Sequence, residues 1–573
     1  MTLRQAQGKK ITGSEAVIKM LLHLGVEVIF GYPGGANMPI YDALYNYRKK
    51  INHILVRHEQ GASHAAEGYA RTTGKPGVCL VTSGPGATNL VTGIADAMMD
   101  SVPLVCITGQ VAAHLLGSDA FQEADVIGIT TPITKWNYQI TNVTEIPEVF
   151  AKAFFIATHA RPGPVVIDIV KSSQFETFNF QYPKNVHIKK FSAKGRSPSG
   201  RYDEEINKAA QWLNKAKRPY MLVGHGVLIG KAEKEVQKLM EKSGIPAAVT
   251  LHGLSSIPVD HPYYVGMLGM HGNYAPNILT NKADVILAVG MRFDDRVTGR
   301  LADYAKKAKI IHIDLDASEH HKIVKAHLAI KADAKDALTQ ILVLITKNSR
   351  KNWINEFKKL QKKEREAADR RLRKRNGQIR MDEVICKLSE LTNGKAILVA
   401  DVGQNQMFSA RFYDFKLPNS YITSGGLGTM GFSLPAAIGA KLGAPQREVF
   451  AVMGDGGFQM TIQELGTIMQ EKLPIKIIIL NNNFLGMVRQ WQELFFEKRY
   501  SFTNMKNPDF VNIAQAYGIP GKKVYKHEEL ENEMQKMRIH PGPYLLEVDI
   551  EQEDNIFPMM PAGASVEEIR LEE

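Results

Sequence analysis

The chain has 573 residues, a formal net charge of +12, and hydrophobic and charged contents of 44% and 23%. This length exceeds what a single hydrophobic core can organise and predicts about three domains. No apolar run reaches the ~18–20 residues of a membrane helix, the N-terminus lacks a signal-peptide pattern, and the three cysteines show no ligand-like spacing, so we expect a cytoplasmic protein without membrane segments.

Strands alternate with helical patterns over residues 11–175, and the pattern returns over 200–346 and 381–550. The clearest strands are predicted at 28–30, 53–56, 77–81, 104–107, 164–169, 219–223, 285–289, 310–314 and 396–401. Such alternation favours doubly wound domains with mainly parallel sheets. The predicted fold class is therefore α/β, with three doubly wound domains, of which the first and third are hypothesised to be copies of one fold.

The segment 347–380 joins the second and third blocks and carries much of the excess positive charge. Glutamates at 356, 364 and 366 interleave with its lysines and arginines, which is typical of a solvated helix, so we predict a basic helical connector. No aromatic-rich basic groove accompanies it, and we therefore expect no nucleic-acid partner. Residues 551–573 are predicted to form a C-terminal tail that could act as a lid.

Two polar ends of neighbouring strands are the most informative feature of the third block. Gly454, Asp455 and Gly456 follow an apolar strand at 448–453, and Asn482 ends a second strand 27 residues after Asp455. A helical segment is predicted at 461–470, between the two strands. Strands joined by such a crossover helix run parallel, so their polar carboxyl ends lie at the same edge of the sheet. Carboxylate and amide oxygens suit Mg²⁺, and the glycines allow a diphosphate to approach the backbone.

This spacing resembles the thiamin-diphosphate motif, although an ordinary βαβ unit with an Asp in its loop is the alternative. Thiamin chemistry also needs a carboxylate, hydrogen-bonded to the cofactor's aminopyrimidine, that helps its exocyclic nitrogen act as a base. Glu59 is the candidate, since it follows the strand at 53–56 and begins a predicted helix. A glutamate in a first helical turn can equally serve the helix dipole alone.

Longer segments extend the resemblance over nearly the whole chain. They are residues 31–36, 57–62, 82–89, 118–123, 267–272, 292–299 and 486–492. On these segments the sequence is similar to the acetohydroxyacid synthases, also called acetolactate synthases, and those at 292–299 and 486–492 are the most selective for that family. The resemblance implies a pyrimidine-binding first domain, an FAD-binding middle domain and a diphosphate-binding third domain.

The resemblance implies an acetolactate synthase reaction. Such an enzyme decarboxylates pyruvate and joins the hydroxyethyl unit to a second 2-keto acid, pyruvate or 2-ketobutyrate. The products, 2-acetolactate or 2-aceto-2-hydroxybutyrate, begin the common route to valine, leucine and isoleucine. A pyruvate oxidase, a 2-keto acid decarboxylase and a catalytically silent scaffold or regulator are the alternatives.

The implied cofactors are thiamin diphosphate, Mg²⁺ and an FAD that is not oxidised or reduced during turnover. The implied assembly is a homodimer or a higher oligomer with sites between subunits, together with a small regulatory subunit.

The resemblance also assigns residues to the thiamin site. Glu59 would activate the cofactor, Phe121 and Gln122 would approach the reacting carbon, and Met430 would support the thiazolium ring. The other implied thiamin contacts are Gly35, Val402, Gln404, Asn405, Gly428, Gly454, Gly456, Gly457 and Met487. The implied metal ligands are Asp455, Asn482 and the carbonyl of Phe484.

Substrate selection is assigned to Arg296 and Trp491, with Lys171 as a further catalytic candidate. A guanidinium can pair with the carboxylate of a 2-keto acid in bidentate fashion. An indole face can favour one extra methylene by roughly 1–3 kcal/mol. A structural ion pair for Arg296 and core packing for Trp491 remain the alternatives.

The implied FAD contacts lie mostly in the middle block. They are Arg161, Gly224, Gly226, Gly269, Met270, His271, Gly272, Gly290, Arg292, Asp314 and Asp333. Two positions depart from the family pattern. Asn405 stands where relatives have His, and therefore cannot carry a proton. Ala112 stands where many relatives have Pro at the substrate entrance.

Overall fold

The computed structural model describes residues 10–184, 203–373, 377–552 and 554–572. Within these ranges the chain forms three six-stranded sheets, all of them parallel, and one small antiparallel pair of β1 (Lys10–Thr12) and β8 (Thr177–Asn179). The predicted α/β class with parallel, doubly wound sheets is thereby confirmed. Residues 200–202, with which the predicted middle domain begins, lie outside the described residues, as do 374–376 of the connector.

The first sheet has the strand order β3-β2-β4-β5-β7-β6. Its strands are β2 (Val28–Gly31), β3 (Asn52–Leu55), β4 (Gly77–Val81), β5 (Leu104–Gln110), β6 (Trp136–Ile140) and β7 (Pro164–Val170). Its helices are α1 (Gly13–His23), α2 (Met38–Tyr45), α3 (Glu59–Thr73), α4 (Pro85–Thr88), α5 (Val91–Asp100), α6 (Val126–Thr130), α7 (Ile146–Thr158) and α8 (Lys171–Phe175). Every residue of β5 and β7 is buried, because helices cover both faces of the sheet.

The middle sheet has the order β11-β10-β9-β12-β13-β14. Its strands are β9 (Pro219–Val223), β10 (Ala247–Val249), β11 (Tyr264–Met267), β12 (Val285–Val289), β13 (Lys309–Asp314) and β14 (Leu328–Lys331). Its helices are α9 (Asp203–Lys215), α10 (His225–Ile229), α11 (Glu233–Ser243), α12 (Tyr274–Thr280), α13 (Asp295–Thr298) and α14 (Ala334–Leu344). Counted within the domain, this is the 3-2-1-4-5-6 order of dinucleotide-binding sheets, which bind at the switch point between β9 and β12.

The third sheet has the order β16-β15-β17-β18-β20-β19. Its strands are β15 (Ile397–Ala400), β16 (Tyr421–Ile422), β17 (Val449–Gly454), β18 (Ile475–Asn481), β19 (Gly521–Val524) and β20 (Tyr544–Asp549). Its helices are α16 (Met381–Thr392), α17 (Gln404–Phe412), α18 (Ser433–Gly443), α19 (Asp455–Met460), α20 (Leu465–Gln470), α21 (Gly486–Phe495), α22 (Phe510–Ala516) and α23 (His527–Ile539). Counted within each domain, the first and third sheets share the order 2-1-3-4-6-5, which supports the hypothesis that they are copies of one fold.

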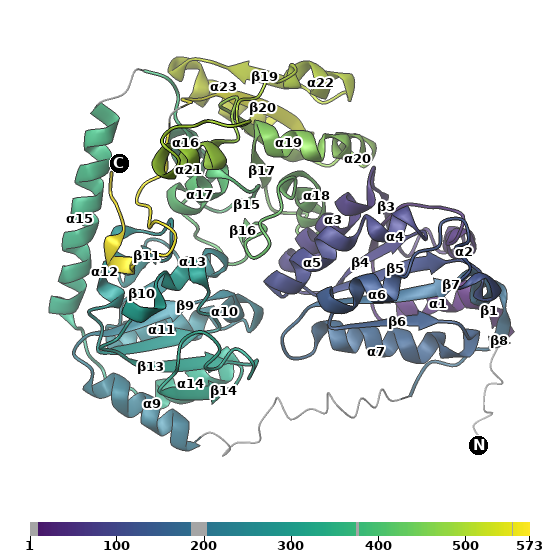
Figure 1. Ribbon diagram of the computed structural model, residues 1–573, viewed down its shortest axis with the longest axis horizontal. Helices are drawn as coiled ribbons and strands as arrows, with labels where there is room; N and C mark the ends of the chain where they lie inside the picture. The colour runs from purple at the N-terminus through teal and green to yellow at the C-terminus, as the bar shows by residue number, and fades with distance from the viewer. Residues whose placement is uncertain (1–9, 185–202, 374–376, 553, 573) are drawn as a thin grey trace.

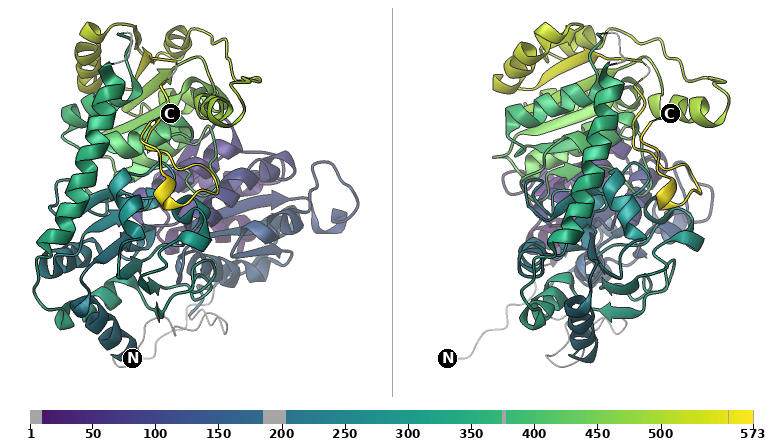
Figure 2. Two further views of the ribbon diagram at one scale, coloured as in Figure 1. Left: turned by 60° about the vertical axis from the view of Figure 1, so that its left-hand side comes forward. Right: turned by 90° about the vertical axis from the view of Figure 1, so that its left-hand side faces the viewer.

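Two predicted elements differ in detail from the structure. The helix predicted at 461–470 is a 3₁₀ turn at Ile462–Glu464 followed by α20, and a further helix, α19, begins before it at Asp455. The basic connector forms α15 (Lys351–Arg373), which spans the middle and third domains (Figure 2). It is more than a solvated helix, since Trp353 and Phe357 are buried in the middle-domain core and the Trp353 indole donates to the carbonyl of Pro219 at 2.8 Å.

The first and third domains pack through α3 and α18, which lie side by side in Figure 1. Glycines make this contact unusually close. A Cβ on Gly439 would lie 1.7 Å from the carbonyl oxygen of Ala65, and one on Gly68 would lie 1.9 Å from that of Ala436. A single hydrophobic core therefore runs across both domains. Among the described residues, no helix combines the length and apolar character needed to cross a membrane.

Candidate functional site

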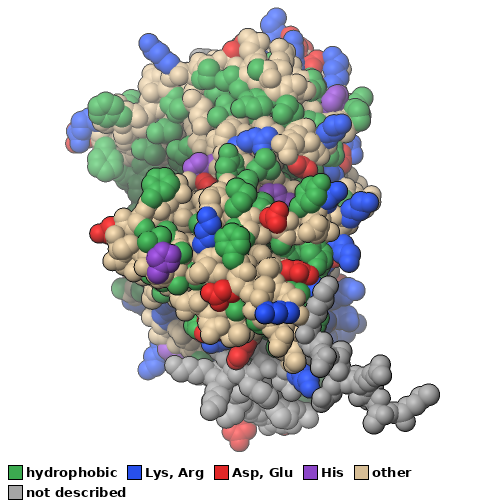
Figure 3. Space-filling model, turned by 90° about the vertical axis from the view of Figure 1, so that its right-hand side faces the viewer, with side chains coloured by type: hydrophobic (Ala, Val, Ile, Leu, Met, Phe, Trp, Pro, Cys, Tyr) green, Lys and Arg blue, Asp and Glu red, His purple; other side chains and the backbone are tan. Residues whose placement is uncertain are grey.

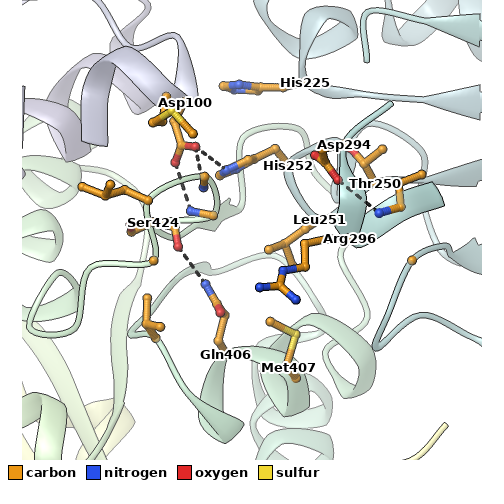
Figure 4. Close-up of a pocket in the computed structure, with 18 of the residues that line it drawn as sticks. Asp100, His225, Thr250, Leu251, His252, Asp294, Arg296, Gln406, Met407 and Ser424 are labelled. Carbon is orange, nitrogen blue, oxygen red and sulfur yellow. Dashed lines mark hydrogen bonds and ion pairs between the residues drawn. The ribbon is translucent and has the colours of Figure 1, made fainter. Parts of the chain in front are cut away.

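A cavity of about 620 Å³ lies where the three domains meet (Figure 4). Most of the predicted site residues line it. They are Arg161, Gly226, Gly269, Met270, His271, Gly290, Arg292, Arg296, Asp314, Asp333, Val402, Gln404, Asn405, Gly428, Met430, Gly454, Asp455, Gly456, Gly457, Asn482, Phe484, Met487 and Trp491. Those that do not line it are Gly35, Glu59, Phe121, Gln122, Lys171, Gly224 and Gly272.

Three helices of the third domain begin at this cavity. They are α17, α19 and α21, and the N-terminus of each lacks a hydrogen bond from a capping side chain. The first backbone N–H groups of a helix have no partner within the helix, and the helix dipole is positive at this end. Three such ends facing one cavity are suited to an anion such as a diphosphate.

Asp455 and Asn482 supply oxygen atoms next to these helix ends. Asp455 accepts a hydrogen bond from the Asn507 amide at 2.6 Å, and no described residue forms an ion pair with it. Burial raises the pKa of Asp455 to about 6. A buried carboxylate without a countercharge is costly, and a bound cation would relieve that cost. The donor set of a carboxylate, an amide oxygen and an adjacent anion cradle fits a hard divalent cation such as Mg²⁺.

The loop that carries Gly428 and Met430 faces the same part of the cavity. Gly428 has φ 76°, in the left-handed region, and a Cβ there would lie 4.0 Å from the Val402 side chain. A Cβ on Gly456 would lie 3.6 Å from the Met430 methyl group. Met430 therefore lies against the Gly-Asp-Gly turn, where an adaptable thioether can pack against a ring.

The other end of the cavity lies at the switch point of the middle sheet. Gly290 has φ 57° and approaches Gly226 so closely that a Cβ on Gly226 would lie 2.6 Å from the Gly290 Cα. Asp314 ends β13, and burial raises its pKa to about 6. Close glycines and a strand-end carboxylate fit the binding of a dinucleotide. Asp333 also caps α14, accepting from the backbone N–H of Lys335 at 2.9 Å, which is a structural role.

Two polar residues at this end, Arg161 and His271, already have neighbours that limit their charge or their freedom to move. Arg161 donates to Glu319 at 2.7 Å. Burial, helped by the nearby cations Arg411 and Arg296, lowers the pKa of His271 to about 3, so its imidazole is neutral.

Arg296 and Trp491 lie between the two ends. The Arg296 guanidinium extends into the open centre of the cavity, and its side chain is 61% exposed (Figure 4). Its nearest carboxylate is that of Asp295, 3.7 Å away and itself exposed, so it remains available to a bound anion. Trp491 is half-buried against the middle-domain core, and its ring lies 5.3 Å from that of Phe495.

Glu59 belongs to a second group of predicted residues, on the first domain. Its carboxylate accepts a hydrogen bond from the Asn89 amide at 2.9 Å, and a Cβ on Gly86 would lie 3.4 Å from it. Gln122 lies beside Gly84, whose added Cβ would meet the Gln122 Cα at 3.0 Å. The structure therefore brings Glu59 and Gln122 to one loop cluster, but it does not bring them to the cavity of Asp455.

The two departures from the family pattern have different surroundings. The Asn405 amide donates to the backbone carbonyl of Asp401 at 2.8 Å, so it holds the turn before α17 as well as lining the cavity. Ala112 precedes a short 3₁₀ turn at Ala113–Leu115 and lies outside the cavity.

Asp100, His225 and His252 line the cavity and were not predicted from sequence. The sequence contains only weak evidence for these residues. Asp96 and Asp100 lie one turn apart on the otherwise apolar helix α5, where both are buried. Buried acids on an apolar helix need partners, but the sequence does not show which segment provides them.

Comparison with known proteins agrees with this geometry. Three domain families described as thiamine pyrophosphate enzyme match the chain: the N-terminal TPP binding domain over residues 11–129, the central domain over 206–341 and the C-terminal TPP binding domain over 401–548.

Full-length relatives agree as well. An acetolactate synthase large subunit of Corynebacterium glutamicum is 44% identical over 99% of this chain and 91% of its own length. An acetolactate synthase large subunit of Lactococcus lactis is 45% identical over 98% of this chain and 96% of its own length. The acetolactate synthase isozyme 2 large subunit of Escherichia coli K12 is 42% identical over 98% of this chain and 99% of its own length.

Proposed function

This chain belongs to the acetolactate synthase large-subunit family of thiamine pyrophosphate enzymes, and we propose that its cavity binds thiamin diphosphate with Mg²⁺ at the Asp455 end and FAD at the Gly290 end. The enzyme is a transferase of branched-chain amino acid biosynthesis. It decarboxylates pyruvate and joins the remaining two-carbon unit to a second 2-keto acid, pyruvate or 2-ketobutyrate. The observation that carries the proposal is the convergence of three uncapped helix ends with the buried carboxylate of Asp455, which forms no ion pair with any described residue.

Thiamin diphosphate, when bound, would supply a carbon nucleophile for a 2-keto acid and an acceptor for the electron pair left by CO₂. Asp455, Asn482 and the carbonyl of Phe484 would hold Mg²⁺, and the N–H groups of α17, α19 and α21 would bind the diphosphate oxygens. Met430 would support the cofactor by packing its adaptable side chain against one of the cofactor's rings. FAD is proposed to fill the middle-domain end without changing its redox state.

Glu59 is proposed to hold a proton in a hydrogen bond to the pyrimidine ring, so that the amino group opposite can act as a base. Gln122 and Phe121 would then border the reacting carbon and exclude water. Arg296 would pair with the carboxylate of the second 2-keto acid, since its guanidinium reaches the cavity and contacts only the exposed Asp295 carboxylate and the weakly accepting sulfur of Met270.

The separation of Glu59 from the cavity supports an assembly of at least two chains, with each site built from Glu59 of one and Asp455 of the other. Phe121 is 88% exposed, which is unusual for a phenylalanine and is explained if a second chain covers it. Hydrophobic side chains reach the surface at several places on the face at the first-domain side (Figure 3). A small regulatory subunit is a further proposed partner, because the relatives are named large subunits.

The function is tested by mixing the protein with pyruvate, thiamin diphosphate, Mg²⁺ and FAD, and identifying the products. Acetolactate is expected. Acetaldehyde would indicate a 2-keto acid decarboxylase, and acetyl phosphate would indicate a pyruvate oxidase. If the protein binds its cofactors but converts no pyruvate, it is a catalytically silent relative. Any of these three results would contradict the proposal.

Trp491 is predicted to select the second substrate. In Trp491→Leu the acceptor's extra methylene loses an aromatic wall, so the preference for 2-ketobutyrate over pyruvate should fall by roughly tenfold or more, while acetolactate still forms. The ratio of the two products in a competition experiment measures this. Phe495→Leu, which removes the aromatic ring packed at a tilt against Trp491, is the matched control and should change the ratio far less. An unchanged ratio in Trp491→Leu would return this residue to a packing role.

A further inference from the structure

The loop of residues 424–430 carries Gly428 and Met430 into the cavity, and residues of the first domain hold it there. Asp100, the last residue of α5, accepts hydrogen bonds from the backbone N–H groups of Gly425 at 3.0 Å and Gly426 at 2.8 Å, one on each carboxylate oxygen. These residues are separated by more than 300 positions in the chain. The loop on which the proposed cofactor packs is therefore fixed from another domain.

A second contact closes the loop on itself. Asp96, one turn before Asp100, accepts a hydrogen bond from the Ser424 hydroxyl at 2.6 Å. The same hydroxyl oxygen accepts the backbone N–H of Thr429 at 2.8 Å. Ser424 thus joins the two ends of the loop, and α5 holds both Ser424 and the two glycines that follow it.

Arg71 and His252 complete the surroundings of Asp100. The Arg71 guanidinium of α3 donates to it at 2.8 Å, and the His252 ring of the middle domain lies 3.0 Å from its other oxygen (Figure 4). Burial acts to raise the pKa of Asp100, but His252 and Arg71 outweigh it and hold the pKa below its usual range. Burial, together with Glu67 and Asp100, raises the pKa of Asp96 to about 8. Asp100 is the ionised member of the pair at neutral pH.

A metal site is the competing interpretation of this region. Ligand atoms of His64, Glu67 and Asp96 all lie within 4.8 Å of one another. However, the Arg71 guanidinium already lies 3.6 Å from Glu67 and supplies the positive charge that a metal ion would bring. The arrangement is therefore a buried charge network around Arg71.

We propose that Asp100 is a positioning residue for the reaction: through Gly425 and Gly426 it fixes the loop that places Met430 against thiamin diphosphate, and through His252 it ties that loop to the middle domain. Asp100, His252, Gly425 and Gly426 all line the cavity between its two ends. The contacts to Asp100 thus join all three domains at the point where the two proposed cofactors would meet. This inference rests on the proposed function of the cavity.

Two variants test the contact from opposite sides. Asp100→Asn keeps the shape but replaces one acceptor oxygen with an NH₂ group that faces a backbone donor. Gly426→Ala places a Cβ 2.6 Å from the Asp100 carboxylate and so moves the loop away, with no positive φ to strain the new residue. Each should raise the Kd of thiamin diphosphate roughly tenfold or more, as expected when a charge-assisted hydrogen bond is lost. The kcat should fall in parallel, while the KM for pyruvate changes less than about twofold, because Arg296 and Trp491 are untouched.

The Kd is measured at saturating Mg²⁺ by the quenching of tryptophan fluorescence, since Trp491 lines the cavity. Thr92→Val is the control on the same helix. Thr92 is exposed and lies outside the cavity, so this variant should leave the Kd within about threefold of wild type. The Tm without cofactors reports folding, and if Asp100→Asn does not fold, Gly426→Ala decides alone.

A folded Asp100→Asn or Gly426→Ala with the wild-type Kd would overturn the inference. An equal loss in Thr92→Val would do the same, because the effect would then belong to any change on α5. Failure of the wild-type protein itself to bind thiamin diphosphate would instead overturn the proposed function.

Discussion

Glu59→Gln should lower the rate of acetolactate formation by about 10²–10⁴-fold, the range that general acid–base groups contribute. Glutamine keeps the shape of the side chain but cannot share a proton with the pyrimidine ring. The diphosphate end of the site is unchanged, so thiamin diphosphate and Mg²⁺ should still bind. The rate, the cofactor Kd, and the exchange of the cofactor's C2 proton for deuterium, followed by NMR, are measured on the same preparation.

The matched control for this variant is Glu148→Gln. Glu148 is an exposed acid in the first turn of α7, where it interacts favourably with the helix dipole. That interaction is also the alternative, purely structural role for Glu59. Glu148→Gln should have almost no effect on the rate. If Glu59→Gln exchanges and turns over at nearly the wild-type rate, Glu59 is a structural residue and the proposed activation is wrong.

Asp455→Ala should abolish Mg²⁺-dependent binding of thiamin diphosphate, because it removes the only carboxylate of the proposed metal site. Loss of an outer-shell partner alone costs about 10–100-fold in metal affinity, so loss of the ligand itself should cost at least about 100-fold. The Kd is measured by titration over a range of Mg²⁺ concentrations.

Asp455→Asn is the graded variant for this site. It keeps one oxygen and the shape, so it should show an intermediate loss that higher Mg²⁺ partly restores. Asp260→Ala, an exposed acid of the middle domain, is the control. Near-normal affinity in Asp455→Ala would count against the metal site.

Local patterns in the sequence predicted much of the fold. The crossover from β17 to β18 could be predicted because continuous apolar runs form buried parallel strands, and parallel strands end at the same edge. The strand orders could not, since they depend on which strands pair after the chain has folded. The 3-2-1-4-5-6 order of the middle sheet, which supports a dinucleotide site, emerges only from the structure.

Some contacts of the candidate site could likewise be predicted from the sequence, and others could not. Asp455 and Asn482 follow strands, so their proximity was open to prediction from spacing. The contact of Asp100 with Gly425 and Gly426 was not, because it links helix α5 to a loop in another domain and neither partner has a distinctive motif. Trp353 and Phe357 of α15 are four positions apart, as residues on one helical face are, but the many charges around them favoured the prediction of a solvated helix.

The claim that each site is shared by two chains has a direct test in subunit exchange. Glu59→Gln and Asp455→Ala are each prepared as inactive proteins, mixed in equal amounts and allowed to exchange subunits. A heterodimer has one site with intact Glu59 from one chain and intact Asp455 from the other, so complete random exchange should restore about one quarter of the wild-type activity. Proven exchange without any recovered activity would place both residues in a site within one chain and contradict the account.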